Sequence, residues 1–253
     1  MSNKENIKMQ KEKRINTIIK NNDTLSPQET LSWAYNTFGN RVSILTSFQL
    51  EGLVIIDMAY TLKCPIRVVT IDTGRLNSET HTLIDQIREK YNLEIETFFP
   101  NHDSLNNMVS KFGTNPFYKS VSLRLMCCQI RKVDPMKQIL LDNDAWITGI
   151  RRSQTITRND ITKIQKDTSY DKDKIKINPL ADWTYEQVWE YIKEKNIPYN
   201  ELYDKGYTSI GCAPCTRPIK PNEDIRSGRW WWEKGEMPKE CGLHVGPSWG
   251  RSN

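Results

Sequence analysis

The sequence predicts an α/β protein, with a Rossmann-like parallel sheet covered by helices on both faces. Two observations predict this fold class: short apolar runs alternate with segments of helical periodicity, and polar turn residues follow the apolar runs. A length of 253 residues is enough to bury a sizeable core. We therefore expect one domain over residues 25–233, preceded by a polar tail at 1–24 and followed by a mobile tail at 234–253.

The first expected helix begins at Ser26-Pro27-Gln28-Glu29. Ser26 is suited to the N-cap, Pro27 to the first helical position, and Glu29 to the return contact of a capping box. The apolar face of this helix would carry Leu31, Ala34, Tyr35 and Phe38.

The elements expected next alternate between strand and helix. They are a strand at 42–46, a turn at 47–52, a helix at 53–62, a strand at 66–71, a helix at about 79–91, and strands at 93–99 and 145–148. Residues 160–176 are polar and rich in lysine and aspartate, which predicts a mobile surface loop. A helix is expected at 184–195, and the stretch from 211 onward has little periodicity.

Alternating strands and helices imply parallel strands, and ligands of such sheets bind beyond the carboxyl ends of the strands. Topology alone therefore predicts that certain polar and glycine positions converge there, namely Ser47, Asp72, Thr73, Gly74 and Gly149.

The composition and termini exclude several classes of protein. No apolar run approaches the roughly 20 residues of a membrane helix, and the first residues lack a signal peptide's apolar stretch, so we expect a cytoplasmic protein without a membrane partner. The formal charge of +5 suits an anionic ligand, although surface lysines explain it equally well. No aromatic and basic pattern of an RNA-binding module is present, so no nucleic-acid partner is expected.

Two cysteine pairs predict a metal centre. Six cysteines in a reducing compartment favour metal binding or catalysis over disulfides. Cys212-Ala213-Pro214-Cys215 has the usual spacing for two ligands, whereas neighbours such as Cys127 and Cys128 point about 100° apart on a straight helix. A [4Fe–4S] cluster tolerates divergent ligands better than zinc does, which favours the cluster. A buried cysteine pair that binds no metal remains the alternative.

Several motifs together resemble one family, the assimilatory adenylyl-sulfate (APS) reductases, which are sisters of the phosphoadenylyl-sulfate (PAPS) reductases. The resemblance runs from about Leu31 to His244 and rests on these motifs: Ile71-Asp72-Thr73-Gly74-Arg75-Leu76, Cys127-Cys128-x-x-Arg131-Lys132, Thr148-Gly149-Ile150-Arg151-Arg152-x-Gln154, Cys212-x-x-Cys215-Thr216-Arg217, Gly228-Arg229-Trp230-Trp231-Trp232 and Lys239-Glu240-Cys241-Gly242-Leu243-His244.

The resemblance implies a sheet related to the ATP pyrophosphatases (adenine nucleotide alpha-hydrolase-like), a [4Fe–4S] cluster held by the four paired cysteines, thioredoxin as reductant, and a homo-oligomer. One departure concerns the phosphate loop of the pyrophosphatases, Ser-Gly-Gly-x-Asp-Ser. This chain has Ser47-Phe48-Gln49-Leu50-Glu51-Gly52 at that place, with a single late glycine.

The implied reaction is the reduction of APS to sulfite and AMP through an enzyme Cys-S-sulfonate. Cys241 would be the nucleophile, and a short C-terminal tail would let it close over the substrate and later meet thioredoxin. Cations that match the motifs would bind the anionic groups: Lys132, Arg226, Arg229 and His244. The nucleotide-site candidates are Ser47, Phe48, Asp72, Thr73, Gly74, Gly149 and Arg158.

Two other functions remain open from the sequence. The same reaction could take PAPS, or both nucleotides. A zinc-stabilised nucleotide-binding or thiolation protein without reductase activity is the alternative from another class. Cys64 is expected to be a small core residue, and the iron–sulfur cluster is expected to act electrostatically and structurally rather than in electron transfer.

Overall fold

The computed structural model describes residues 13, 15–19, 24–155, 158–171 and 173–233. Its first long helix, α2 (Pro27–Phe38), begins where the sequence predicts. The Ser26 side chain accepts a hydrogen bond from the Glu29 amide, and the Glu29 carboxylate accepts one from the Ser26 amide at 2.7 Å. Within the stretch expected to be a polar tail, residues 15–19 are helical and Ile15 is buried in the main core.

A six-stranded sheet forms the centre of the fold, in the order β3-β2-β1-β4-β6-β5. All neighbouring strands are parallel except β5 and β6, which pair in antiparallel fashion. The strands are β1 (Val42–Leu45), β2 (Arg67–Ile71), β3 (Ile95–Phe98), β4 (Ala145–Ile147), β5 (Ile164–Lys166) and β6 (Ile175–Ile177). The predicted α/β class with a mostly parallel sheet is confirmed.

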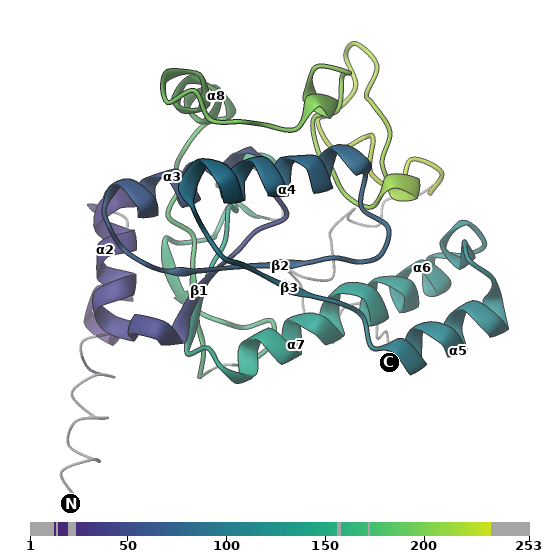
Figure 1. Ribbon diagram of the computed structural model, residues 1–253, viewed down its shortest axis with the longest axis horizontal. Helices are drawn as coiled ribbons and strands as arrows, with labels where there is room; N and C mark the ends of the chain where they lie inside the picture. Colours follow the sequence, from purple (N-terminus) through teal and green to yellow (C-terminus); the bar gives the residue numbers. More distant parts are fainter. Residues whose placement is uncertain (1–12, 14, 20–23, 156–157, 172, 234–253) are drawn as a thin grey trace, which may run out of the picture.

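Helices cover both faces of this sheet (Figure 1). Because side chains alternate along a strand, neighbours in β2 face opposite ways. Val68 belongs to the main core beneath α3 (Leu50–Thr61) and α4 (Ser78–Tyr91), whereas Val69 packs with Met136 of α7 (Asp134–Leu141).

Three parts of the prediction need correction. The helix expected at 53–62 begins three residues earlier, at Leu50; every residue from Leu50 to Ala59 is buried, so no polar face of the helix marks where it starts. The expected loop at 160–176 contains strand β5 and leads directly into β6, since Ile164 and Ile175 are buried in the core. Between β3 and β4 lie helices that the sequence reading omitted: α5 (His102–Phe112), η3 (Pro116–Tyr118), α6 (Val121–Cys128), the π-helical turn η4 (Gln129–Val133) and α7.

The chain then returns across the carboxyl edge of the sheet. Helix α8 (Tyr185–Glu194) begins with Thr184 as its N-cap, and the stretch that follows, residues 201–233, is hereafter the C-terminal segment. This segment contains the short 3₁₀-helical turns η7 (Glu201–Tyr203) and η8 (Ala213–Cys215) and little other regular structure, as predicted. No described helix is long and apolar enough to cross a membrane.

Candidate active site

A pocket lies at the carboxyl edge of the sheet, where ligands of parallel sheets bind. Its floor is formed by the residues that follow three strands: Thr46 and Ser47 after β1, Thr73 after β2, and Thr148 and Gly149 after β4. Of the residues predicted to converge here, Ser47, Thr73 and Gly149 line the pocket at the edge where topology placed them, whereas Asp72 and Gly74 are not among its lining residues.

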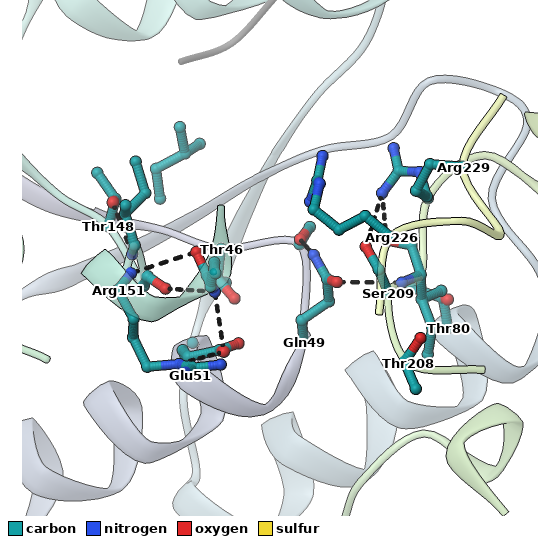
Figure 2. A pocket seen from close by; sticks show the side chains of 18 of the residues that line it. Thr46, Gln49, Glu51, Thr80, Thr148, Arg151, Thr208, Ser209, Arg226 and Arg229 are labelled. Carbon is teal, nitrogen blue, oxygen red and sulfur yellow. Dashed lines mark hydrogen bonds and ion pairs between the residues drawn. The ribbon is translucent and has the colours of Figure 1, made fainter. Parts of the chain in front are cut away.

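The C-terminal segment forms the opposite wall. Figure 2 shows Thr46, Thr148 and Arg151 on one side, Ser209, Arg226 and Arg229 on the other, and Gln49 between them. The Gln49 carboxamide joins the two walls, since its Nε2 donates to Ser47 Oγ at 3.0 Å and its Oε1 accepts from the Ile210 amide at 3.0 Å. A residue of the 47–52 loop thus connects the carboxyl edge of the sheet to the segment that carries Cys212.

Close backbone approach explains two of the glycines. A Cβ on Gly149 would lie 2.6 Å from Glu51 Cβ and 3.2 Å from the Gly52 amide nitrogen, so a side chain would collide with the start of α3. A Cβ on Gly211 would lie 2.5 Å from Arg229 Nη2. Glycine at these two positions leaves room for the pocket floor and for the Arg229 guanidinium.

The pocket is strongly cationic. Among its described lining residues Glu51 is the acidic one, and the basic ones are Lys132, Arg151, Arg158, Arg226 and Arg229. Glu51 is itself neutralised, because its Oε1 accepts from Arg151 Nε at 2.8 Å and from Gln154 Nε2 at 2.9 Å. The remaining cations suit a ligand with several negative charges.

Arg229 is held where it can serve such a ligand. It is buried, its Nη1 donates to Ser209 Oγ at 3.2 Å, and its guanidinium carbon lies 4.8 Å from the centre of the Trp230 ring. An arginine fixed on an aromatic face presents its donors without a large loss of conformational freedom.

Three of the paired cysteines share one buried group, hereafter the thiol core. It joins Cys127 at the end of α6 to Cys212 and Cys215 around η8, and its other members are Met108, Phe117 and Trp230. The Thr73 hydroxyl lies 3.3 Å from Cys212 Sγ, so the thiol core is in contact with the pocket floor. Cys128, which is half-buried, is followed at once by the π-helical turn η4, so the helix is distorted next to the adjacent pair.

The thiol core is an unfavourable place for bare thiolates. Burial, and after it the neighbouring Cys212, raises the pKa of Cys215 to about 12, against which Lys132 and Arg229 act. Burial likewise raises the pKa of Cys127, and Arg131 opposes that shift. A metal centre would displace these protons, and four cysteines are the usual ligand set of a [4Fe–4S] cluster. The donor chemistry fits, although no three His, Cys, Asp or Glu side chains in the described ranges are grouped as ligands of one metal ion.

The structure brings together seven of the predicted substrate-site residues. Those that line the pocket are Ser47, Thr73, Lys132, Gly149, Arg158, Arg226 and Arg229. Phe48 is buried in the main core, and its backbone has a φ of 55°. Asp72 lies outside the lining and accepts from the Gly74 amide at 2.7 Å and contacts His81 Nε2 at 2.9 Å. Cys241 and His244 lie outside the described residues.

The sequence reading missed several lining residues. Arg151 and Gln154 belong to a motif quoted for the family resemblance, which was a usable signal. Gln49 belongs to the 47–52 loop that was compared with the pyrophosphatase phosphate loop, which was also a usable signal, whereas Ser209 lies in no quoted motif.

Comparison with known proteins agrees with this geometry. The family model described as phosphoadenosine phosphosulfate reductase domain matches residues 41–218. The chain belongs to this family. It is 45% identical over 206 residues to the adenosine 5'-phosphosulfate reductase of Burkholderia cepacia, covering 81% of each chain. It is 43% identical over 225 residues to that of Pseudomonas aeruginosa strain LESB58, covering 87% of this chain and 83% of the relative.

Solved structures give the same assignment. The phosphoadenylyl-sulfate reductase of Candida auris, solved as a phosphate complex, is similar with a TM-score of 0.67 at 35% identity, over 79% of this chain and 94% of that one. The FMN adenylyltransferase of Candida glabrata shares the fold alone, with a TM-score of 0.54 at 16% identity over 91% of this chain and 74% of that one. The protein is thus an enzyme, an oxidoreductase acting on a sulfur group.

Proposed function

We propose that this enzyme reduces adenylyl sulfate to sulfite and AMP in assimilatory sulfate reduction, with thioredoxin as the reductant. The observation that carries the proposal is the pocket itself, which joins a nucleotide-binding sheet edge to a cationic wall and, through Thr73 and Cys212, to the thiol core. Relatives named adenosine 5'-phosphosulfate reductase support APS as the preferred nucleotide.

The pocket would divide the substrate between its two walls. The loops after the strands, with Ser47, Thr73 and Gly149, offer backbone and hydroxyl groups to the nucleoside. Lys132, Arg226 and Arg229 would bind the phosphate and sulfate oxygens and stabilise the negative charge that develops on the departing AMP. Arg158 also lines the pocket and would contact the nucleotide, and His244 would add a further cationic contact from the tail.

The first step would be attack by the Cys241 thiolate on the sulfate sulfur. A new S–S bond forms, the bond between sulfur and the bridging oxygen breaks, and AMP leaves with that electron pair. Nearby cations favour both the thiolate and the leaving group. The product on the enzyme is a Cys241 S-sulfonate, in which Sγ carries an SO3⁻ group.

The second step would consume a dithiol. A thioredoxin thiolate attacks Cys241 Sγ, the S–S bond breaks, and sulfite leaves with its electron pair. The second thioredoxin thiol resolves the mixed disulfide, so Cys241 is regenerated and thioredoxin supplies both electrons.

The paired cysteines Cys127, Cys128, Cys212 and Cys215 would hold a [4Fe–4S] cluster. When bound, this group supplies electrostatic and structural support next to the pocket rather than electrons. Lys132 follows the first pair and Arg229 acts on the thiol of the second, so the chain's own residues connect the cysteines to the anion site. The family resemblance also supports a homo-oligomer in the cytoplasm.

Turnover and colour test the proposal together. Purified enzyme with thioredoxin should release sulfite from APS faster than from PAPS, and it should be brown with stoichiometric iron and sulfide. Faster turnover of PAPS would support the second candidate, which the similarity to the Candida auris enzyme favours. A colourless zinc protein that releases no sulfite would contradict both and favour the nucleotide-binding or thiolation alternative.

A further inference from the structure

A buried ion pair lies where the described chain ends, next to the thiol core. Arg124 of α6 donates from Nε to Glu233 Oε1 at 2.8 Å and from Nη2 to Glu233 Oε2 at 2.9 Å. The side chains are only 1% and 10% exposed. A two-bond pair of this geometry is among the strongest and most directional polar contacts that a protein makes.

The residues on either side of this pair are fixed as well. The Glu233 amide donates to the Trp230 carbonyl at 2.9 Å, and the Trp230 amide donates to the Cys215 carbonyl at 3.1 Å. Trp232 Nε1 donates to the Phe117 carbonyl at 3.2 Å. Arg124 and Arg229 both pack on the Trp230 ring, at 4.7 and 4.8 Å from its centre.

Glu233 is close in the sequence to both the pocket and the proposed nucleophile. Arg229 of the pocket is four residues before Glu233, and Cys241 is eight residues after it. Eight residues span at most about 27 Å, whereas four span at most about 14 Å. A tail that starts at Glu233 is therefore long enough for Cys241 to reach the pocket, and its starting point is fixed within that reach.

We propose that the Arg124–Glu233 pair is a positioning device for the nucleophile, which anchors the start of the tail and so raises the effective concentration of the Cys241 thiol at the bound substrate. This inference rests on the proposed role of Cys241. A reactive group on a short tether with a fixed starting point has a high effective concentration at its target. That concentration falls when the starting point of the tether becomes mobile. Arg124 and Glu233 are positioning residues, and neither needs to touch the substrate.

The test uses Glu233→Gln in the full-length, iron-loaded enzyme. Single-turnover sulfonation of Cys241 by APS, measured without reductant, should slow roughly tenfold, while AMP affinity and iron content stay unchanged. The matched control is Glu96→Gln, which removes a carboxylate that also takes two bonds from one arginine, Arg67, at 2.6 Å each. This control pair joins β2 to β3 outside the pocket lining, and the variant should sulfonate at the normal rate.

Two results would overturn the inference. One is a normal sulfonation rate in folded Glu233→Gln. The other is a loss of AMP affinity and iron in parallel with the rate, which would make the pair a general structural contact. If Glu233→Gln does not fold, Glu233→Asp keeps the charge but withdraws it by one methylene, and the same slower sulfonation is expected. Continued sulfite release by Cys241→Ser would instead refute the proposed function, which separates the two failures.

Discussion

The sheet and the C-terminal segment are stabilised in different ways, although both line the same pocket. The sheet is held by an apolar core on each face, with buried residues such as Ile44, Val68 and Ile147 on one side and Val69 and Trp146 on the other. The C-terminal segment depends instead on individual contacts: the ion pair of Arg124 with Glu233, the packing of two arginines on Trp230, and the thiols of Cys212 and Cys215.

This difference indicates a division of tasks. A core of buried aliphatic side chains forms without any added group, so the strand-end side of the pocket should persist in a protein that lacks the proposed cluster. Among the described residues, the wall that holds Arg229 packs on the smaller thiol core, whose buried members are three cysteines with Met108, Phe117 and Trp230. We expect the chemistry to be more sensitive than nucleotide binding to any change in the C-terminal segment.

The largest effect is expected from Cys241→Ser. Because a serine hydroxyl cannot replace the thiolate as nucleophile under these conditions, sulfite release should fall to background while AMP binding stays normal. Sulfite formation measures the chemical step, and AMP affinity measures nucleotide binding. Cys64→Ser is the matched control, since Cys64 is half-buried against the main core and away from the pocket lining. Residual turnover well above background in Cys241→Ser would show that another group attacks the substrate.

The next largest effect is expected from Cys212→Ser. The change removes one proposed ligand of the iron–sulfur cluster, so iron content and activity should be lost together. The far-ultraviolet circular dichroism of the sheet and helices should change little, because the main core contains none of the four paired cysteines. An active enzyme without the cluster would refute the proposed link between the thiol core and the anion site.

Arg229→Gln should lower kcat/KM for APS by roughly a hundredfold, as expected when one preorganised donor to a developing charge is removed. The guanidinium is buried beside Ser209 and Trp230, so its donors are held in one position. Arg67→Gln is the control, because Arg67 starts β2 and so lies at the amino end of the strands, opposite the pocket. Equal kinetics for Arg229→Gln and the wild type would remove Arg229 from the substrate site.

Gln49→Ala breaks the connection between the two walls and should act mainly on binding. Loss of about 1 kcal/mol of net hydrogen bonding corresponds to a roughly fivefold higher KM, with kcat little changed. Steady-state kinetics on APS give both constants. Gln165→Ala provides the comparison, since Gln165 Oε1 accepts from the Thr162 amide at 3.1 Å on another part of the chain. A fall in kcat at constant KM would mean that Gln49 serves the chemical step instead.

The smallest effect is expected from Glu96→Gln on the sheet. The hydrogen bond from Arg67 holds the pKa of Glu96 below its ordinary value of 4.5. A lowered carboxyl pKa contributes stability that is fully present above the ordinary value and is lost as the pH falls through the folded-state value. The variant should be less stable by about 0.5 kcal/mol at pH 7, and this difference should shrink in thermal unfolding below about pH 4.5. A stability difference between the variant and the wild type that grows as the pH falls would contradict the predicted pH dependence.

The fold could be predicted from sequence where its signals are local. The capping box at Ser26 and the apolar runs that became β1, β2 and β4 depend on neighbouring residues alone. The strands β5 and β6 escaped detection because their few apolar side chains stand among lysines and aspartates, and only packing against the core reveals them.

The candidate site also has a part that local sequence signals predict and a part that they do not. Ser47, Thr73 and Gly149 follow strands, so topology could place them at one edge. The contact between Gln49 and Ile210 joins residues 161 positions apart, and the Arg124–Glu233 pair joins residues 109 positions apart. No periodicity or spacing in the sequence encodes such contacts. The family resemblance named Arg226 and Arg229 of the second wall, but the way this wall meets the edge of the sheet became visible only in three dimensions.

The most direct test of the account is the covalent intermediate. The enzyme is incubated with APS in the absence of thioredoxin, digested, and examined by mass spectrometry. The account predicts one sulfonate group per chain, carried by the peptide that contains Cys241, together with one equivalent of AMP, and no sulfonate in Cys241→Ser. A sulfonate on a different residue, or release of sulfite without any modified cysteine, would contradict it.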